Sequence, residues 1–257
     1  MSEPNASPPG SRVLWIVLFV GSAFLAAASL RLTWKYPAFG IALVSILLGV
    51  LVWRWVRDRR YARALERGDA SRVISKWNAA VDGMPHADTM APLMAATALA
   101  AFGRVREARE TLANAKRGPV WDAAVEHRLF VDILLTTFEG EADLAEKHAS
   151  RLVELPAPSS PEIRTRVLSL REATAALTRA FAHRARPDDL ARLEQASMAS
   201  PLVHWAMRYG ATIVAIDHGD LEKSLRLLEG APDWPAESSF RAFHEELLRE
   251  ATVRGAA

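Results

Sequence analysis

The residues whose spacing comes nearest to a reactive site are His244, Glu245 and Glu246, close to the C-terminal end of the chain. In a His-Glu-x-x-His helix, two histidines one turn apart bind zinc and the glutamate acts as a general base. The position of the second histidine is occupied here by Leu248, whose side chain cannot bind a metal. A zinc-hydrolase site is therefore not expected on this helix.

The rest of the sequence offers no other reactive pattern. The remaining histidines are dispersed, and no two are three or four residues apart, as two ligands on one helical face would be. The absence of cysteine excludes disulfides, iron–sulfur ligation and thiolate zinc sites. The sequence also has no phosphate-binding glycine loop and no Gly-x-Ser-x-Gly turn. We therefore predict a protein that is not an enzyme, with no catalytic, cofactor-binding or metal-binding residues and no cofactor. The histidines concerned are His86, His127, His148, His183, His204 and His218.

The elements that would position any site begin with two apolar stretches, residues 13–30 and 38–56. About 18–20 helical residues are needed to cross a hydrocarbon core about 30 Å thick. The short link between the stretches includes Trp34, Tyr36 and Pro37, which suit an interfacial turn and the start of a helix. These features predict two transmembrane helices that form a hairpin, preceded by a disordered tail over residues 1–12.

Arginines that follow the second stretch predict the orientation of the hairpin. Basic residues that flank a span are retained on the cytoplasmic side of a membrane. The sequence therefore predicts an integral protein of a bacterial-type cytoplasmic (inner) membrane, with two spans and both termini in the cytoplasm. Residues 13–56 would contact the lipid bilayer, and anionic headgroups would lie near the arginines. The cluster comprises Arg54, Arg57, Arg59, Arg60 and Arg63.

A cleaved signal peptide is the other interpretation of the first stretch. Ala26, Ala27 and Ala28 resemble the small-residue site at which such peptides are cut. The apolar run is, however, longer than the usual length of about 7–15 residues, and the residues before it are poor in basic side chains. Both interpretations leave residues 57–257 in the cytoplasm.

Charge is distributed unevenly between the two parts of the chain. Residues 1–67 contain nine Arg or Lys and three Asp or Glu, a net charge of +6, whereas the whole chain has +2. The remaining residues, 68–257, therefore carry −4. Because a nucleic-acid-binding domain needs a basic face, we expect no nucleic acid partner.

Residues 57–257 show helical spacing of apolar residues and no alternating strand pattern, which predicts an all-α fold. A unit recurs in which a glycine is followed five positions later by a small or β-branched residue, and later by a proline. The glycine ends one helix and permits a tight turn, and the small residue lets the two helices approach closely. The glycines are Gly68, Gly103, Gly140 and Gly219, the small or β-branched residues are Val73, Ala108, Ala145 and Ser224, and the prolines are Pro85, Pro119, Pro156 and Pro235.

This pattern resembles the tetratricopeptide repeat (TPR) family over most of residues 54–253, and the second helix of each unit matches best. The resemblance implies a TPR-like α-solenoid of about five helix pairs, whose concave surface binds a protein or peptide partner. The order of two spans, an arginine-rich stretch and helical repeats is similar to that of HemY-type membrane proteins. The similarity includes a Leu-x-x-Gly-Asp turn, here Leu65, Gly68 and Asp69, and it concerns topology alone.

The segment from Pro161 to Ser200 departs most from the repeat and is interpreted as a TPR-like pair with an eroded turn. Here the sequence predicts a long helix over about 161–185 and a second helix that ends near Ala199. Asp188 or Asp189 would cap the second helix. A last helix over about 236–253 would cap the stack with a polar outer face. That face would contain Glu245, Glu246, Arg249 and Glu250.

Aromatic and basic residues of the repeats supply the candidates for recognition. Trp77 and Trp205 are expected in the core between helices, because large aromatic side chains dominate core burial. Trp121 and Trp234 lie beside proline-containing turns, where each is either an exposed anchor for a partner or a staple that closes the turn. A groove that clamps a peptide carboxylate would need cations from successive first helices, with a solvated position as the alternative for each. The candidates are Arg128, Arg164, Arg171 and Arg208.

Two functions fit these features. The first is a non-catalytic, membrane-anchored TPR-like scaffold that binds a protein partner at the cytoplasmic membrane surface. The alternative is a structural subunit of a larger membrane complex, such as assembly, secretion or envelope machinery, whose transmembrane hairpin makes specific contacts. Gly21, Gly40 and Gly49 would allow such helices to approach closely.

Overall fold

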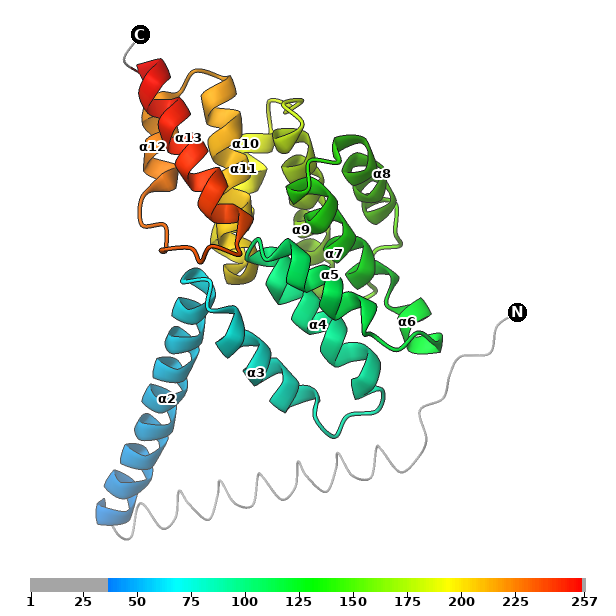
Figure 1. Ribbon diagram of the computed structural model, residues 1–257. Helices are drawn as coiled ribbons and strands as arrows, with labels where there is room; N and C mark the ends of the chain where they lie inside the picture. The colour runs from blue at the N-terminus through cyan, green and yellow to red at the C-terminus, as the bar shows by residue number, and fades with distance from the viewer. Residues whose placement is uncertain (1–36, 256–257) are drawn as a thin grey trace. The chain divides into compact units, whose positions relative to one another are not determined.

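The computed structural model describes residues 37–255, and every regular element among them is a helix. The predicted all-α fold is therefore confirmed for this part of the chain (Figure 1). The helices are α2 (Pro37–Glu66), α3 (Ala70–Val81), α4 (Ala87–Ala101), α5 (Val105–Ala113), α6 (Pro119–Ala123), α7 (Val125–Phe138), α8 (Ala142–Val153), α9 (Pro161–Phe181), α10 (Asp189–Ala199), the 3₁₀ turn η1 (Pro201–Val203), α11 (His204–Asp217), α12 (Leu221–Leu228) and α13 (Ser239–Gly255).

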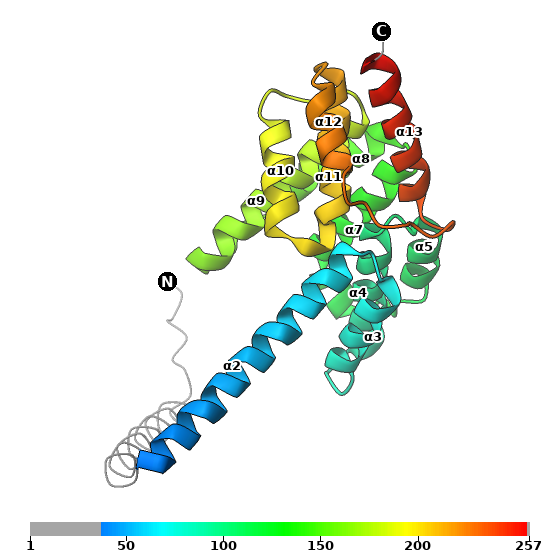
Figure 2. The same ribbon diagram turned by 90° about the vertical axis from the view of Figure 1, so that its left-hand side faces the viewer.

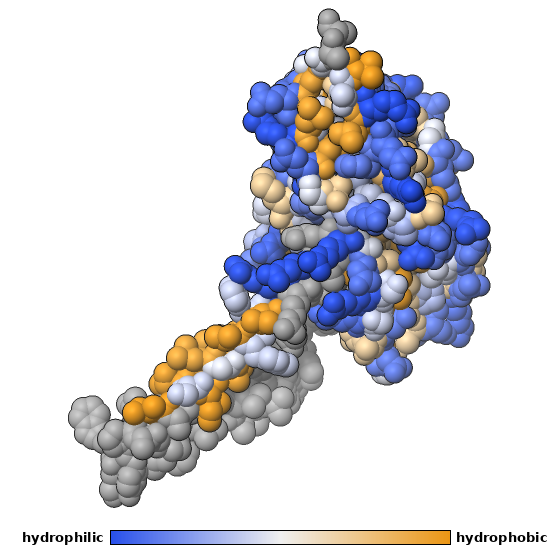
Figure 3. All heavy atoms as spheres, turned by 60° about the vertical axis from the view of Figure 1, so that its left-hand side comes forward, coloured by the Kyte–Doolittle hydropathy of each residue, from blue (hydrophilic) through white to orange (hydrophobic). Residues whose placement is uncertain are grey.

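The chain divides into two units, one ending at Arg60 and the other beginning at Tyr61. The described residues of the first unit belong to α2, and many of its large apolar side chains are more than half exposed (Figure 3). The second predicted span, 38–56, lies in this helix. Of the helices that the structure describes, none combines the length and hydropathy that crossing a membrane requires, so this span is not confirmed. The predicted tail (1–12) and first span (13–30) lie outside the described residues.

Helical hairpins make up most of the second unit. In the described region, α4 packs on α5, α7 on α8, α9 on α10, and α11 on α12. The first helices also contact one another in series, because α4 touches α7, α7 touches α9, and α9 touches α11. Helix α3 packs against α4 at the start of this series (Figures 1 and 2). Gly103, Gly140 and Gly219 lie just before the second helix of a hairpin, whereas Gly68 lies just before α3.

The turns of the four hairpins share one hydrogen-bond pattern. In each, one N–H bonds the carbonyl three residues back and the next N–H bonds the carbonyl five residues back, which closes the helix end. The first, second and fourth turns have glycine at the first of these positions. The turn between α9 and α10 has His183 there, with φ 54°. Helix α9 therefore ends at Phe181, and the prediction that it continues to about residue 185 is wrong. The donors at the two positions are Gly103 and Arg104, Gly140 and Glu141, His183 and Arg184, and Gly219 and Asp220.

The predicted cap of α10 also differs from the structure. Asp188 occupies the cap position, but its side chain makes no capping hydrogen bond. Asp189, in the first turn, is 1% exposed, and its carboxylate accepts two bonds from the guanidinium of Arg179, at 2.8 and 2.6 Å. The same carboxylate accepts the N–H of Arg186 at 2.8 Å. Asp189, the last residue of the Arg186-Pro187-Asp188-Asp189 segment, thus forms a buried ion pair with Arg179 of α9 and does not cap α10.

The segment between α12 and α13, residues 229–238, is called the strap here because it connects distant hairpins. At its end, the Ser238 hydroxyl donates to the Phe102 carbonyl at 2.7 Å, and the backbone N–H of Ser239 donates to the Gly103 carbonyl at 2.9 Å. Trp234, in the middle of the strap, is buried, and a Cβ atom at Gly68 would overlap its ring. Trp234 is therefore a staple that closes the strap onto the domain, and the exposed-anchor interpretation is wrong.

Aromatic rings join α13 to the ends of earlier helices. The ring of Phe240 lies 5.1 Å from that of Phe138 at the end of α7, and Phe243 lies 5.3 Å from Phe181 at the end of α9. Such edge-to-face pairs add to the burial of the rings themselves. Helix α13 also packs on α11 and α12 (Figure 2). It begins at Ser239, three residues later than predicted, and of the predicted outer face Glu245, Glu246 and Arg249 are exposed while Glu250 is partly buried.

Candidate binding cleft

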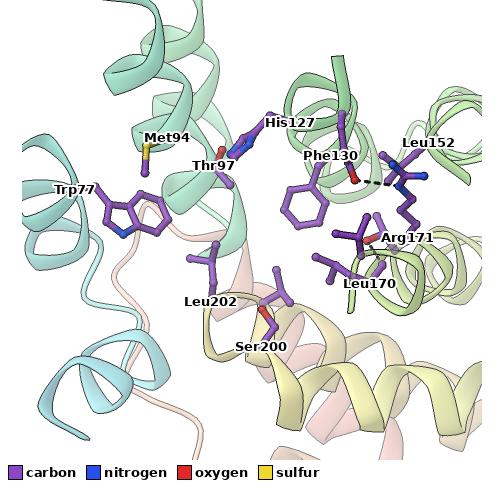
Figure 4. Close-up of a pocket in the computed structure, with 14 residues that line it drawn as sticks. Trp77, Met94, Thr97, His127, Phe130, Leu152, Leu170, Arg171, Ser200 and Leu202 are labelled. Atoms are coloured by element: carbon purple, nitrogen blue, oxygen red, sulfur yellow. Dashed lines mark hydrogen bonds and ion pairs between the residues drawn. The ribbon is translucent and has the colours of Figure 1, made fainter. Parts of the chain in front are cut away.

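A cleft of about 340 Å³ lies among α3, α4, α7, α8, α9 and η1, within the second unit (Figure 4). Its walls come mainly from the first helices of successive hairpins. The side chains that line it are Trp77, Met94, Thr97, Glu126, His127, Phe130, Leu152, Val167, Leu170, Arg171, Thr174, Ser200, Leu202 and Val203. Most are apolar, as expected for a pocket in which burial supplies affinity and a few polar groups fix orientation.

Helix α9 extends the apolar wall beyond the cleft. Val167 and Leu170 line the cleft, and Ile163, one turn before Val167, is 55% exposed. Residues separated by three or four positions lie on one face of a helix. The face therefore continues from the cleft toward the N-terminal end of α9, which is the longest helix of the second unit. An apolar stripe of this kind is the surface onto which an amphipathic helix or an apolar peptide segment packs.

The polar end of the cleft is built around Arg171. Its side chain is only 4% exposed, and its Nε donates to Oε1 of Glu126 on α7 at 2.9 Å. Its two other guanidinium nitrogens donate to the carbonyls of Leu155 and Pro156, at 2.6 and 3.2 Å. These bonds fix the α8–α9 loop to α7 and α9. The Arg171 charge is thus neutralised by a carboxylate of the protein itself, while Glu126 remains 46% exposed at the cleft.

His127 stands beside Glu126 at the rim of the cleft, facing Thr97 of α4 (Figure 4). Packing of part of the imidazole against its neighbours lowers its pKa, and the Glu126 carboxylate offsets part of that effect. The ring is therefore neutral at pH 7 and can donate or accept a hydrogen bond. With Thr97, Thr174 and Ser200, it gives the cleft hydrogen-bonding groups without a net positive charge.

The four arginines predicted for a carboxylate-clamping groove do not form one. Arg171 lines the cleft but is already paired. Arg164 donates to the carbonyls of Pro158 and Ser159, and Arg208 donates to the carbonyl of Arg226 while lying 4.6 Å from the Trp205 ring centroid. Arg128 faces the other side of α7, close to Trp121. The cleft therefore offers mainly apolar surface, and the arginine that lines it is already paired.

The structure also shows what surrounds the C-terminal histidine. Burial lowers the pKa of His244, and its ring packs 6.1 Å from that of Tyr209. Within residues 37–255, no group of three histidine or acidic side chains is arranged to hold a metal ion. Trp205 is buried, as predicted, while Trp77 packs against the core on one side and lines the cleft on the other.

Comparison with known protein families, with characterised proteins and with solved structures gives no match to this chain. The cleft itself is therefore the feature from which a function can be inferred. Sequence reasoning did not find the cleft residues Phe130, Met94 and Leu202, which come from three separate elements. The spacing of Ile163, Val167 and Leu170 was the available signal, since these apolar residues lie on one face of the helix.

Proposed function

We propose that this chain is a non-catalytic, TPR-like helical scaffold, attached to a bacterial-type cytoplasmic membrane, that binds an apolar segment of a protein partner. The observation that carries the proposal is the apolar cleft and its continuation along α9. The cleft is lined by first helices of successive hairpins, which is where a TPR-like solenoid would present its concave surface. Because most of the side chains that line the cleft are apolar, it suits a partner that is bound by burial of apolar surface.

The exposed face of α2 supports membrane attachment. The apolar side chains that are more than half exposed are Ile41, Val44, Ile46, Leu47, Leu48, Val50, Leu51, Val52, Trp53 and Trp55. A continuous exposed apolar surface of this kind is unfavourable in water and favours contact with lipid or with other apolar helices. At its end, the guanidinium of Arg59 lies 3.9 Å from the Trp55 ring centroid, a pairing suited to the interface between lipid and water.

The same surface supports the alternative, a structural subunit of a larger membrane complex whose hairpin makes specific helix contacts. Gly49 distinguishes the two functions, because a Cβ atom there would meet nothing within 4 Å in the described structure. Gly49→Leu should therefore leave the chain intact and should not affect a simple anchor. If Gly49→Leu, together with Gly21→Leu and Gly40→Leu, releases co-purifying membrane proteins, the subunit function is favoured.

The scaffold proposal is tested by site-specific photo-crosslinking of the full-length protein in native membranes. A crosslinking side chain at Ile163 or Val167 should capture one defined partner, and the same group at Met198 should not. Met198, on α10, is 78% exposed and does not line the cleft, so it is an apolar control. Ile163→Glu should abolish the capture from position 167, whereas Met198→Glu should not.

The outcome that contradicts scaffold binding is equally defined. Equal capture from positions 163 and 198, or capture from position 167 that persists in the Ile163→Glu variant, would show that the stripe does not recognise a partner. Membrane attachment is tested separately, by alkaline extraction of membranes that contain the full chain. Release of the protein into the supernatant would contradict integral attachment without bearing on the cleft.

A further inference from the structure

A second, smaller cleft lies on the other side of α7 and has a different chemistry. Its volume is about 190 Å³, and α5, α6, α7 and α8 contribute to it. Its apolar wall includes Leu112 and Trp121. Its polar groups are Arg128 and Asp132 of α7, followed by His148 and Arg151 of α8.

The two clefts are separated by α7 itself. The larger cleft is lined by residues 126, 127 and 130, and the smaller by 125, 128, 129 and 132. At about 3.6 residues per turn these two sets project from nearly opposite sides of the helix. The smaller cleft is therefore independent of the partner-binding surface proposed above.

Polar atoms in the smaller cleft lack partners although they are buried. Nε of Arg128 and Nδ1 of His148 are inaccessible to solvent, and no group in the described part of the chain bonds either atom. Leaving such atoms unpaired costs about 1–3 kcal/mol each. The Arg128 guanidinium instead lies 5.0 Å from the centroid of the Trp121 ring. Native structures retain few unpaired groups of this kind. Two of the five such atoms among the described residues belong to side chains that line this one cleft, so a polar ligand bound there would meet side chains whose hydrogen bonds the protein does not complete.

The charges in the cleft define what that ligand would be. Arg128 and Arg151 contribute two positive charges and Asp132 one negative charge, so the cleft carries a formal charge of +1 when His148 is neutral. Burial raises the pKa of Asp132, and His148, Arg109 and Arg128 offset part of the effect. These groups therefore interact within one poorly solvated site.

We propose that this cleft binds a single carboxylate carried on a short apolar stem. The guanidinium groups of Arg128 and Arg151 hold the carboxylate, since the planar fork of arginine matches its two oxygens. The stem lies against Trp121 and Leu112. A monoanion neutralises the cleft, whereas a phosphate dianion would leave an excess negative charge beside Asp132.

The experiment uses the full-length protein in detergent and measures binding of butyrate by saturation-transfer NMR. Butyramide, which has the same shape and no charge, is the ligand control. Butyrate should bind, butyramide should not, and Arg128→Gln and Arg151→Gln should each weaken butyrate binding by about tenfold or more. Arg106→Gln, an exposed arginine on α5 that does not line the cleft, should bind butyrate normally.

Arg151 is exposed, so its replacement keeps the test valid even if Arg128→Gln disturbs packing on Trp121. Absence of butyrate binding, equal binding of butyramide, or unchanged affinity in Arg151→Gln would each overturn the proposal. The last measurement is competition between butyrate and inorganic phosphate for the cleft. Displacement of butyrate by phosphate at equal or lower concentration would contradict the match to a single negative charge.

Discussion

The indole nitrogen of Trp234 donates a hydrogen bond of 2.6 Å to the hydroxyl of Tyr209, and both side chains are buried. Burial raises the pKa of Tyr209 above its ordinary value, with a smaller opposing effect from this bond and from Arg208. The tyrosine hydroxyl is therefore protonated at neutral pH. This single bond connects the strap to α11 and orients the ring that covers the Gly68 turn.

Tyr209→Phe should lower the free energy of unfolding by about 1–3 kcal/mol, because the buried indole N–H would lose its acceptor. Urea denaturation of the full-length protein measures the effect. The matched variant is Trp234→Phe, and a double-mutant cycle between the two gives their coupling energy. A coupling energy of zero would contradict a contribution of this bond to stability.

Gly68→Ala should be much more destabilising than Gly83→Ala. Both glycines have positive φ, 66° and 83°, so alanine costs about 1–2 kcal/mol at either position. A Cβ at Gly68 would overlap the ring of Trp234, whereas at Gly83 nothing lies within 4 Å. Overpacking adds about 1–3 kcal/mol at Gly68 alone. Thermal unfolding of the two variants tests the difference, and equal melting temperatures would show that Trp234 does not cover this turn.

Asp189→Asn should lower the free energy of unfolding at pH 7 by about 3–5 kcal/mol, because it leaves the Arg179 charge inside the domain without its carboxylate. Glu139→Gln is the matched control. Its partner Arg109 has a side chain that is 45% exposed, so the loss there should be about 0–1 kcal/mol. Similar losses in the two variants would contradict the importance of burial.

The same ion pair predicts a pH dependence. Burial alone would raise the pKa of Asp189, but the bonds from Arg179 and Arg186 outweigh it, so the pKa is lower in the folded domain. The stabilisation is therefore present above the unfolded value of about 3.9 and is lost as the pH falls through the lower folded value. Urea midpoints between pH 7 and pH 3 should fall more steeply for the natural chain than for Asp189→Asn.

His183→Gly should stabilise the domain, although it removes a side chain. His183 has φ 54°, which costs a non-glycine residue about 1–2 kcal/mol. Its imidazole lies 2.9 Å from the Asp217 carboxylate, an exposed pair of about 0–1 kcal/mol. Relief of strain should therefore exceed the lost pair and raise the melting temperature. His183→Ala is the control, since it removes the pair and keeps the strain, and it should lower the melting temperature.

The sequence predicted the hairpins where glycine spacing marks them. It missed the true end of α9 because His183 adopts a conformation that glycine adopts in the other turns, and no local rule identifies such a histidine. It missed the role of Asp189 because the partner, Arg179, lies ten residues earlier on another helix. The predicted groove arginines failed for a related reason. All four arginines lie on first helices of hairpins, as predicted. Which side of a helix faces the next hairpin, however, depends on packing across the whole domain.

The cleft was beyond sequence reasoning because its walls belong to six elements. Apolar residues such as Phe130 and Leu202 have the same pattern whether they fill a core or line a cavity. The apolar stripe on α9 was the one sequence signal of an uncovered apolar surface. Ile163 continues the helical spacing of Val167 and Leu170, but in the folded domain its side chain is 55% exposed.

The strap gives the domain a property that a simple row of repeats does not have. A row can fray from either end, because each unit depends only on its neighbours. Here a side-chain bond joins residues 136 positions apart, Ser238 and Phe102, and ties the last hairpin to the first. Neither end is then free to melt alone. Amide protons in α4 and α11 should exchange with solvent in one concerted step, and a single protease cut within residues 229–238 should convert that step into gradual loss from both ends.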